Sequence, residues 1–213
     1  MREIELRYCT VIIVCLIFTL TLSGCLSVPN SPTPRFYTLN AVEESRPAEK
    51  FNIPSAIIIG VGPLKIPEYL NRPQIVTQDK DKMLTFAQFD RWGESLDLGL
   101  ERLISENLTA MLGGATIKMF PWNLAIPVSY QVIIEVLQLE SELDKDLFFV
   151  VQWSVIDIES EKMVLIKTSE FRHPVEPHNY SGLAKTLSAA CASLSSEIAT
   201  ALAALPEPKE KSI

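Results

Sequence analysis

Three consecutive segments of the chain, residues 130–139, 147–158 and 163–171, alternate apolar and polar side chains and are joined by short polar turns. A period of two is typical of β-strands that bury one face. Turns this short connect antiparallel neighbours, because parallel strands need a crossover of a dozen residues or more. The three segments therefore predict an antiparallel meander with one face turned to a core. The apolar positions of the second segment are Leu147, Phe149, Val151, Trp153 and Val155.

Two other segments have apolar residues at spacings of three and four, which is typical of amphipathic helices. The first covers about residues 91–112 and the second about residues 180–205. Gly113-Gly114 ends the first helix, and Pro206 ends the second. The apolar stripes are Leu96, Leu100, Leu103, Ile104, Leu108 and Met111 in the first helix, and Leu183, Leu187, Cys191, Leu194, Ile198 and Leu202 in the second.

Shorter apolar runs at residues 36–39, 56–61 and 115–120 predict three further strands. Residues 75–77 and 83–89 flank a polar turn at residues 79–82 and predict a hairpin. Two helices with one apolar stripe each are best buried against a single sheet face. We therefore predict one α+β domain over residues 36–206, with a mixed, mainly antiparallel sheet and both amphipathic helices packed on one face.

The N-terminal segment predicts a lipid anchor. Residues 11–22 are apolar and uncharged, but a bilayer-spanning helix needs roughly 20 such residues. Ser23 and Gly24 lead directly into Cys25, an arrangement that resembles the bacterial lipoprotein signal. In that signal the cysteine receives a diacylglycerol and an N-acyl chain and becomes the first residue of the mature protein. We therefore expect residues 1–24 to be a signal peptide; the alternative is a cysteine beside an uncleaved apolar anchor.

The segments that flank the predicted domain are polar. Residues 26–35 hold three prolines and two serines and form, with Cys25, a lipidated Ser/Pro-rich tether over residues 25–35. The ten residues after Cys25 reach at most ~35 Å. Residues 207–213 form a charged tail. Because the formal net charge is −7, we expect no nucleic-acid partner and attribute membrane attachment to the acyl chains of Cys25, with no role for a basic patch.

The sequence shows no complete set of catalytic or metal-binding residues. His173 and His178 lie five residues apart beside prolines, which predicts solvated loop histidines and not a metal site. The glycine pairs lack the endings of phosphate-binding loops, and no nucleophile elbow is present. Cys191 lies on a helical apolar stripe, which favours a buried small hydrophobe over a reactive thiol. We expect no enzyme, no metal and no cofactor beyond the acyl chains on Cys25.

Three segments mix aromatic, apolar and proline residues outside any regular period. They are residues 63–76, residues 89–96 and residues 120–122. Each segment either seals an edge of the core or exposes aromatic side chains as a protein-binding surface. The sequence leaves both interpretations open.

The segments FYTL, IIIGVGPLKIPEYLNRPQIVTQ and FDRWGESLDLGLERLISENL resemble the auxiliary lipoproteins of ABC-type lipid-transport systems, which include the lipoprotein of MCE-type operons. The resemblance implies an outer-membrane lipoprotein on the periplasmic side that docks a membrane-bridging MCE-domain protein, with a homo-oligomeric ring as a further implication. Because Leu26, and no Asp, follows Cys25, outer-membrane placement is preferred over the inner membrane. The strongest markers are taken as partner-binding residues, and they are Tyr69, Arg72, Pro73, Arg91 and Trp92.

Two other classes of function compete with this one. An envelope lipoprotein that regulates or assembles a cell-wall or outer-membrane complex would share the same anchor and the same lack of catalytic residues. A lipid-anchored hydrolase would need a pocket with a nucleophile or a perturbed acid, which the sequence does not offer. We also expect substitutions at Arg72 or Trp92 to weaken partner contacts more than folding.

Overall fold

The structure is a computed structural model that describes residues 7, 13, 31–41, 50–79, 81–123 and 125–206. The chain divides into two units, Met1–Thr33 and Pro34–Ile213. In the first unit, Arg7 and Ile13 have helical backbone. Apart from these two residues, the predicted signal peptide, Cys25 and the tether up to residue 30 lie outside the described residues, as does the tail 207–213. Within the described residues, no helix has the length and hydrophobicity needed to cross a bilayer.

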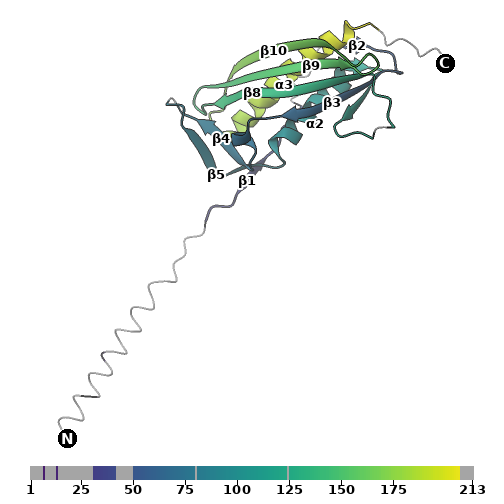
Figure 1. The fold of residues 1–213 in the computed structure, drawn as a ribbon. Helices are drawn as coiled ribbons and strands as arrows, with labels where there is room; N and C mark the ends of the chain where they lie inside the picture. The colour runs from purple at the N-terminus through teal and green to yellow at the C-terminus, as the bar shows by residue number, and fades with distance from the viewer. Residues whose placement is uncertain are drawn as a thin grey trace. The chain divides into compact units, whose positions relative to one another are not determined.

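A five-stranded sheet with the order β10-β9-β8-β3-β7 is the main layer of the second unit (Figure 1). Strands β8 (Tyr130–Ser141), β9 (Asp146–Asp157) and β10 (Lys162–Pro174) pair antiparallel and form the predicted meander. Strand β3 (Ile58–Lys65) pairs parallel with both β8 and β7 (Thr116–Met119).

The buried face of this sheet carries the predicted alternation. Val61, Val132 and Val155 lie in one cross-strand row, and all three are buried completely. A register shift after Val136 then moves the buried positions of β8 from even to odd numbers. Leu139 is consequently only 9% exposed, whereas Leu137, the residue at the shift, lies 47% exposed. Such a bulge adds one residue to one strand, which no regular period can predict.

Helices α2 (Leu96–Met111) and α3 (Tyr180–Ala203) pack against each other and lie behind the five-stranded sheet, on its buried face (Figure 1). Every residue of the two predicted apolar stripes is buried. Asn179 caps α3, because its side chain accepts a hydrogen bond from the Gly182 N–H at 2.9 Å. The α+β class, the mixed sheet and the two helices are therefore confirmed.

The start of the first helix differs from the prediction. Strand β5 (Leu84–Trp92) continues through residues 91 and 92, and α2 begins only at Leu96. The reason is strand pairing: Arg91 lies opposite Gln74 of β4 (Gln74–Gln78) on one side and opposite Phe36 of β1 (Arg35–Tyr37) on the other. These long-range partners hold residues 91 and 92 in a strand although they precede a helical stripe.

Two small sheets complete the fold. Strands β1, β5 and β4 form a three-stranded sheet, hereafter the small sheet, in which β4 and β5 are the predicted hairpin and β1 pairs parallel with β5. A one-turn helix, η3 (Glu68–Leu70), precedes β4. Strands β2 (Phe51–Asn52) and β6 (Leu112–Gly113) pair parallel at the end of α2.

Candidate docking surfaces

The structure separates the five predicted partner-binding residues. Trp92 is only 7% exposed and belongs to the core, whereas Arg91, its neighbour in β5, is half-buried on the opposite face of the small sheet. Tyr69 is half-buried, and its hydroxyl donates to the Leu139 carbonyl at 3.4 Å. Pro73 is exposed, and its carbonyl accepts the Trp92 N–H at 2.8 Å. The five residues therefore do not form one exposed surface.

Arginine and phenylalanine side chains gather on the outer face of the small sheet. Phe36 is 65% exposed and lies opposite Arg91 in the pairing of β1 with β5. Phe86 is 45% exposed, and the guanidinium carbon of Arg72 lies 4.2 Å from the centre of its ring, which is a cation–π contact. We call Phe36, Arg72, Phe86 and Arg91 the arginine–aromatic face.

The opposite side of the same sheet carries a satisfied ion pair. Arg35 contacts the buried carboxylate of Asp90 at 2.8 Å, and the Tyr37 hydroxyl donates to the same carboxylate at 2.7 Å. Burial alone would raise the pKa of Asp90, but the hydrogen bonds from Arg35 and Tyr37 outweigh it and hold that pKa below its ordinary value. Asp90 is therefore charged at neutral pH and ties β1 to β5.

A second surface is the face of the meander that the helices leave uncovered. In the registers of β8, β9 and β10, residues opposite one another share a face, and this face carries many apolar side chains. We call these residues the open sheet face: Ile133, Leu137, Phe148, Ile156, Met163 and Ile166. Met163 and Ile166 on the edge strand β10 are 56% and 55% exposed. An antiparallel sheet usually turns polar residues to solvent, so this composition indicates a contact surface.

The third predicted segment, residues 120–122, covers the strand β3 on the sheet face that points away from the helices, because Gly60 lies opposite Gln131 and alternates with the buried Val61. The Trp122 ring lies against Gly60 so closely that a Cβ added to Gly60 would come within 2.5 Å of it. Phe120 meets Trp122 edge-on, with ring centres 5.6 Å apart. Gly60 was not predicted to have this role; the signal in the sequence is a glycine within an otherwise β-branched strand, which often marks a close approach.

Beneath this segment lies a carboxylate that the sequence analysis did not identify. Glu101 faces the core from α2, and its two oxygens accept the main-chain N–H groups of Leu64 at 3.2 Å and Phe120 at 3.0 Å. Burial raises the pKa of Glu101, although these two hydrogen bonds oppose the shift. The contact spans the point where β3 shifts register against β8 after Val61. Glu101 therefore has a structural role at this irregularity.

The turn between β8 and β9 is rich in acidic residues, and these form ion pairs. Lys145 contacts Glu142 at 2.6 Å, and Arg172 contacts Asp146 at 2.8 Å. A hollow of about 280 Å³ lies beside these pairs, lined also by Lys82 and Glu140, which contact each other. Because each of these cations already faces a carboxylate, the hollow does not present a net charge to a ligand.

Within the described residues, the tertiary structure brings together no further side chains that would form a catalytic or metal site. Among the described residues, no group of three His, Cys, Asp or Glu side chains is placed to hold a metal ion. His178 is exposed in the loop before α3, as predicted, whereas the prediction is wrong for His173, which lies half-buried in β10 because this strand pairs with β9 as far as Pro174. Cys191 is fully buried, and burial raises the pKa of its thiol to about 12. The prediction that Cys191 packs as a small hydrophobe is confirmed.

Comparison with known proteins shows relatives at the level of family and fold. The model of the family described as ABC-type transport auxiliary lipoprotein component matches residues 37–199. A crystal structure of an uncharacterized protein is 18% identical, with a TM-score of 0.65 over 80% of this chain and 99% of the other. A crystal structure from Xanthomonas campestris is 13% identical, with a TM-score of 0.57 over 78% and 91% of the two chains. At these identities the likeness is one of fold alone. No curated protein matches the chain.

Proposed function

Because the chain belongs to the family of ABC-type transport auxiliary lipoprotein components, we propose that it is a lipid-anchored periplasmic accessory subunit of an ABC transport system for lipids. In this function, acyl chains on Cys25 hold the domain at the periplasmic side of the outer membrane. The domain docks a membrane-bridging MCE-type protein of the same transport system. It acts by binding and catalyses no reaction.

The open sheet face is the observation that supports docking. Both helices pack on the other side of the sheet, so the apolar residues of this face meet no second layer among the described residues (Figure 1). Strands of this length run about 40 Å, which is long enough for an interface of ordinary size. Apolar contacts surrounded by charged residues such as Glu135 and Arg172 have the composition of a protein interface.

Photo-crosslinking in intact cells tests this surface. A photoreactive side chain replaces Ile166 or Leu137, both of which lie on the open sheet face, or Glu106 as the control. Glu106 is exposed on α2, which packs behind the sheet. We expect Ile166 and Leu137 to give adducts with an MCE-type protein and Glu106 to give none.

Three other results would contradict the proposal. Adducts with cell-wall enzymes alone would favour an envelope regulator. Adducts with a second copy of the chain would make the open sheet face an interface between copies. Equal yields from Ile166, Leu137 and Glu106 would show that this face is not the docking surface.

A further inference from the structure

We propose that the arginine–aromatic face of the small sheet is a second membrane contact, which binds the phospholipid surface next to the acyl anchor. The occupant is a bilayer: Phe36 and Phe86 enter the interfacial layer, and Arg72 and Arg91 bind lipid phosphates. The inference rests on the lipid anchor of the proposed function but needs no transporter partner.

The four side chains share one side of the small sheet. Arg91 of β5 lies opposite Phe36 of β1, so both point to the same face. Phe86 lies opposite Val76 of β4 and Arg91 opposite Gln74, two residues earlier, so a register shift in this pair brings Phe86 to the face of Arg91. Arg72 reaches over the Phe86 ring from the segment before β4. Trp92 points to the core from the position next to Arg91, which leaves the outer face to arginine and phenylalanine. Aromatic rings and arginine stems are the side chains that suit the boundary between headgroups and acyl chains.

The arginines of this face differ in their partners from the other arginines of the domain. Arg35, Arg102 and Arg172 each contact a carboxylate within 3.0 Å. Among the described residues, Arg72 and Arg91 contact no carboxylate. The Nε atom of each is buried, so a phosphate would meet the terminal nitrogens of the guanidinium. A guanidinium with unused donors matches the geometry of a phosphate group. The face thus offers two such donors in a chain whose net charge is −7.

The length of the tether limits how far this face can lie from Cys25. Strand β1 begins at Arg35, ten residues after Cys25, and ten residues span at most ~35 Å. An acidic domain is repelled by anionic lipid as a whole, so a patch with two arginines binds weakly from solution. A short tether raises the effective concentration of the bilayer at the patch to the millimolar range, at which a weak contact forms. No other sheet of the domain is as close to Cys25 along the chain.

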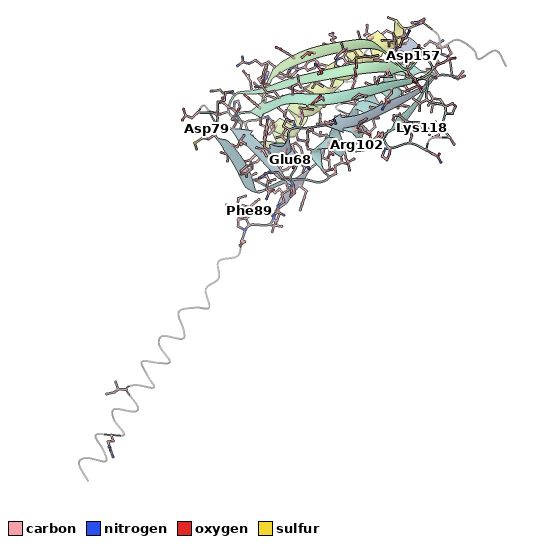
Figure 2. The ribbon with its side chains drawn as sticks, in the orientation of Figure 1. Glu68, Asp79, Phe89, Arg102, Lys118 and Asp157 are labelled. Carbon is pink, nitrogen blue, oxygen red and sulfur yellow. The ribbon has the colours of Figure 1, made fainter. Side chains whose placement is uncertain are left out.

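Depth-dependent fluorescence quenching tests the contact with the full acylated protein. The protein is reconstituted in vesicles of phosphatidylethanolamine and phosphatidylglycerol that contain brominated lipids. A bimane probe is attached at Gln88→Cys, an exposed position of β5 between Phe86 and Arg91, or at Glu159→Cys. Glu159 lies two residues after Asp157, and Gln88 lies next to Phe89. Figure 2 shows Asp157 and Phe89 at opposite ends of the domain, so the two probe positions are far apart. Cys191 is buried and does not react with the probe.

We expect bromolipid quenching at Gln88→Cys and little at Glu159→Cys. The double variant Arg72→Gln, Arg91→Gln should lower quenching at position 88 to the level of position 159, and so should Phe36→Ser. Phe36 is exposed, so its substitution leaves the fold intact. A charge-matched control, Lys118→Gln with Lys162→Gln, removes two cations from exposed positions of β7 and β10 and should leave the quenching unchanged.

The proposal is overturned if the probe at position 88 is quenched no more than the probe at position 159. It is also overturned if the arginine variant and the charge-matched control lose quenching equally, because the contact would then depend on net charge alone. A protein adduct from position 88 in cells, without quenching by lipid, would assign the face to a protein. The vesicles contain no transporter, so these results are independent of the crosslinking test above.

Discussion

Arg91 and Trp92 are adjacent in β5, and their side chains lie on opposite faces of the small sheet. Trp92 packs in the core, and Arg91 points outward beside Phe36. The two residues therefore have different roles, although the sequence analysis grouped them as one partner-binding motif.

Trp92→Ala should lower the free energy of unfolding by about 3–5 kcal/mol, because it removes a large buried side chain and leaves a cavity. Arg91→Gln should change it by less than about 0.5 kcal/mol, since no hydrogen bond or ion pair is lost. Urea unfolding of the two variants checks this difference. A stable Trp92→Ala protein with weakened partner binding would restore the sequence-based interpretation of Trp92.

Gly60→Ala should destabilise the protein by about 1–3 kcal/mol, because the new Cβ would come within 2.5 Å of the Trp122 ring. The cost should shrink when Trp122→Ala is present, and thermal unfolding of the double-mutant cycle measures this coupling. Gly113→Ala is the matched control, because its Cβ meets only the Phe51 carbonyl, at 3.6 Å. Equal losses at Gly60 and Gly113 would exclude the Trp122 contact as the cause.

Glu101→Gln should change how stability depends on pH. The raised pKa of Glu101 means that the folded state binds the proton more tightly than the unfolded state. Its contribution to stability is therefore complete below the ordinary pKa of glutamate and is lost as the pH rises through the raised value. Over that pH range the free energy of unfolding of the wild type should fall relative to that of Glu101→Gln, so any advantage of the wild type becomes smaller.

The same substitution also has a cost that does not depend on pH. Glutamine has one acceptor oxygen, which can serve the Leu64 N–H, while the Phe120 N–H keeps the Val61 carbonyl at 2.9 Å as its acceptor. The loss of one of two acceptors should therefore cost about 1 kcal/mol. Glu106→Gln, on the exposed side of the same helix, is the control and should have little effect. Denaturant titrations at several pH values measure both effects. A difference between wild type and Glu101→Gln that stays constant with pH would contradict the assignment.

Cys191 should resist thiol reagents in the folded protein. Its thiol is fully buried and its pKa is raised to about 12, so almost no thiolate forms near pH 8. Maleimide labelling of the mature protein, followed by mass spectrometry, should show no modification at Cys191 in buffer and complete modification in urea. Rapid labelling in buffer would mean that α3 opens or that the thiol is exposed.

Cys25→Ser should abolish the incorporation of labelled fatty acid and leave an unprocessed precursor. The physical reason is that acylation forms a thioether at the cysteine sulfur, which serine lacks. Cys191→Ser is the matched control, because that residue lies in the core and should keep the label. Unchanged labelling of Cys25→Ser would exclude the anchor but would leave the open sheet face to be tested by crosslinking.

The local spacing of apolar residues was sufficient to predict the regular strands and helices and their buried faces. The alternation of Leu147, Phe149 and Val151 predicts the buried face of β9, and the spacing of Leu183 and Leu187 predicts that of α3. These patterns are informative because a strand or helix that buries one side must repeat its own geometrical period. The bulge after Val136 follows no period and could not be predicted in this way.

The candidate surfaces depended on contacts between distant parts of the chain. Arg72 and Phe86 lie on different segments, and only the pairing of β4 with β5 brings them together. The helix start was misplaced at Arg91 because the partners that hold this residue in a strand, Phe36 and Gln74, are far away in sequence. The sequence pattern around Arg91 and Trp92 did not indicate which of the two side chains points outward.

The amino-acid sequence by itself determined the α+β class, the meander, both helical stripes and the burial of Cys191, since each follows from a local period or composition. Tertiary structure alone decided that Trp92 is buried while the half-buried Arg91 lies on the outer face of the small sheet, that Trp122 covers Gly60, and that Glu101 supports the irregular part of β3. The physical reason is that strand register and sheet order are set by the packing of the whole core. A shift of one residue in register turns every side chain of a strand to the other face.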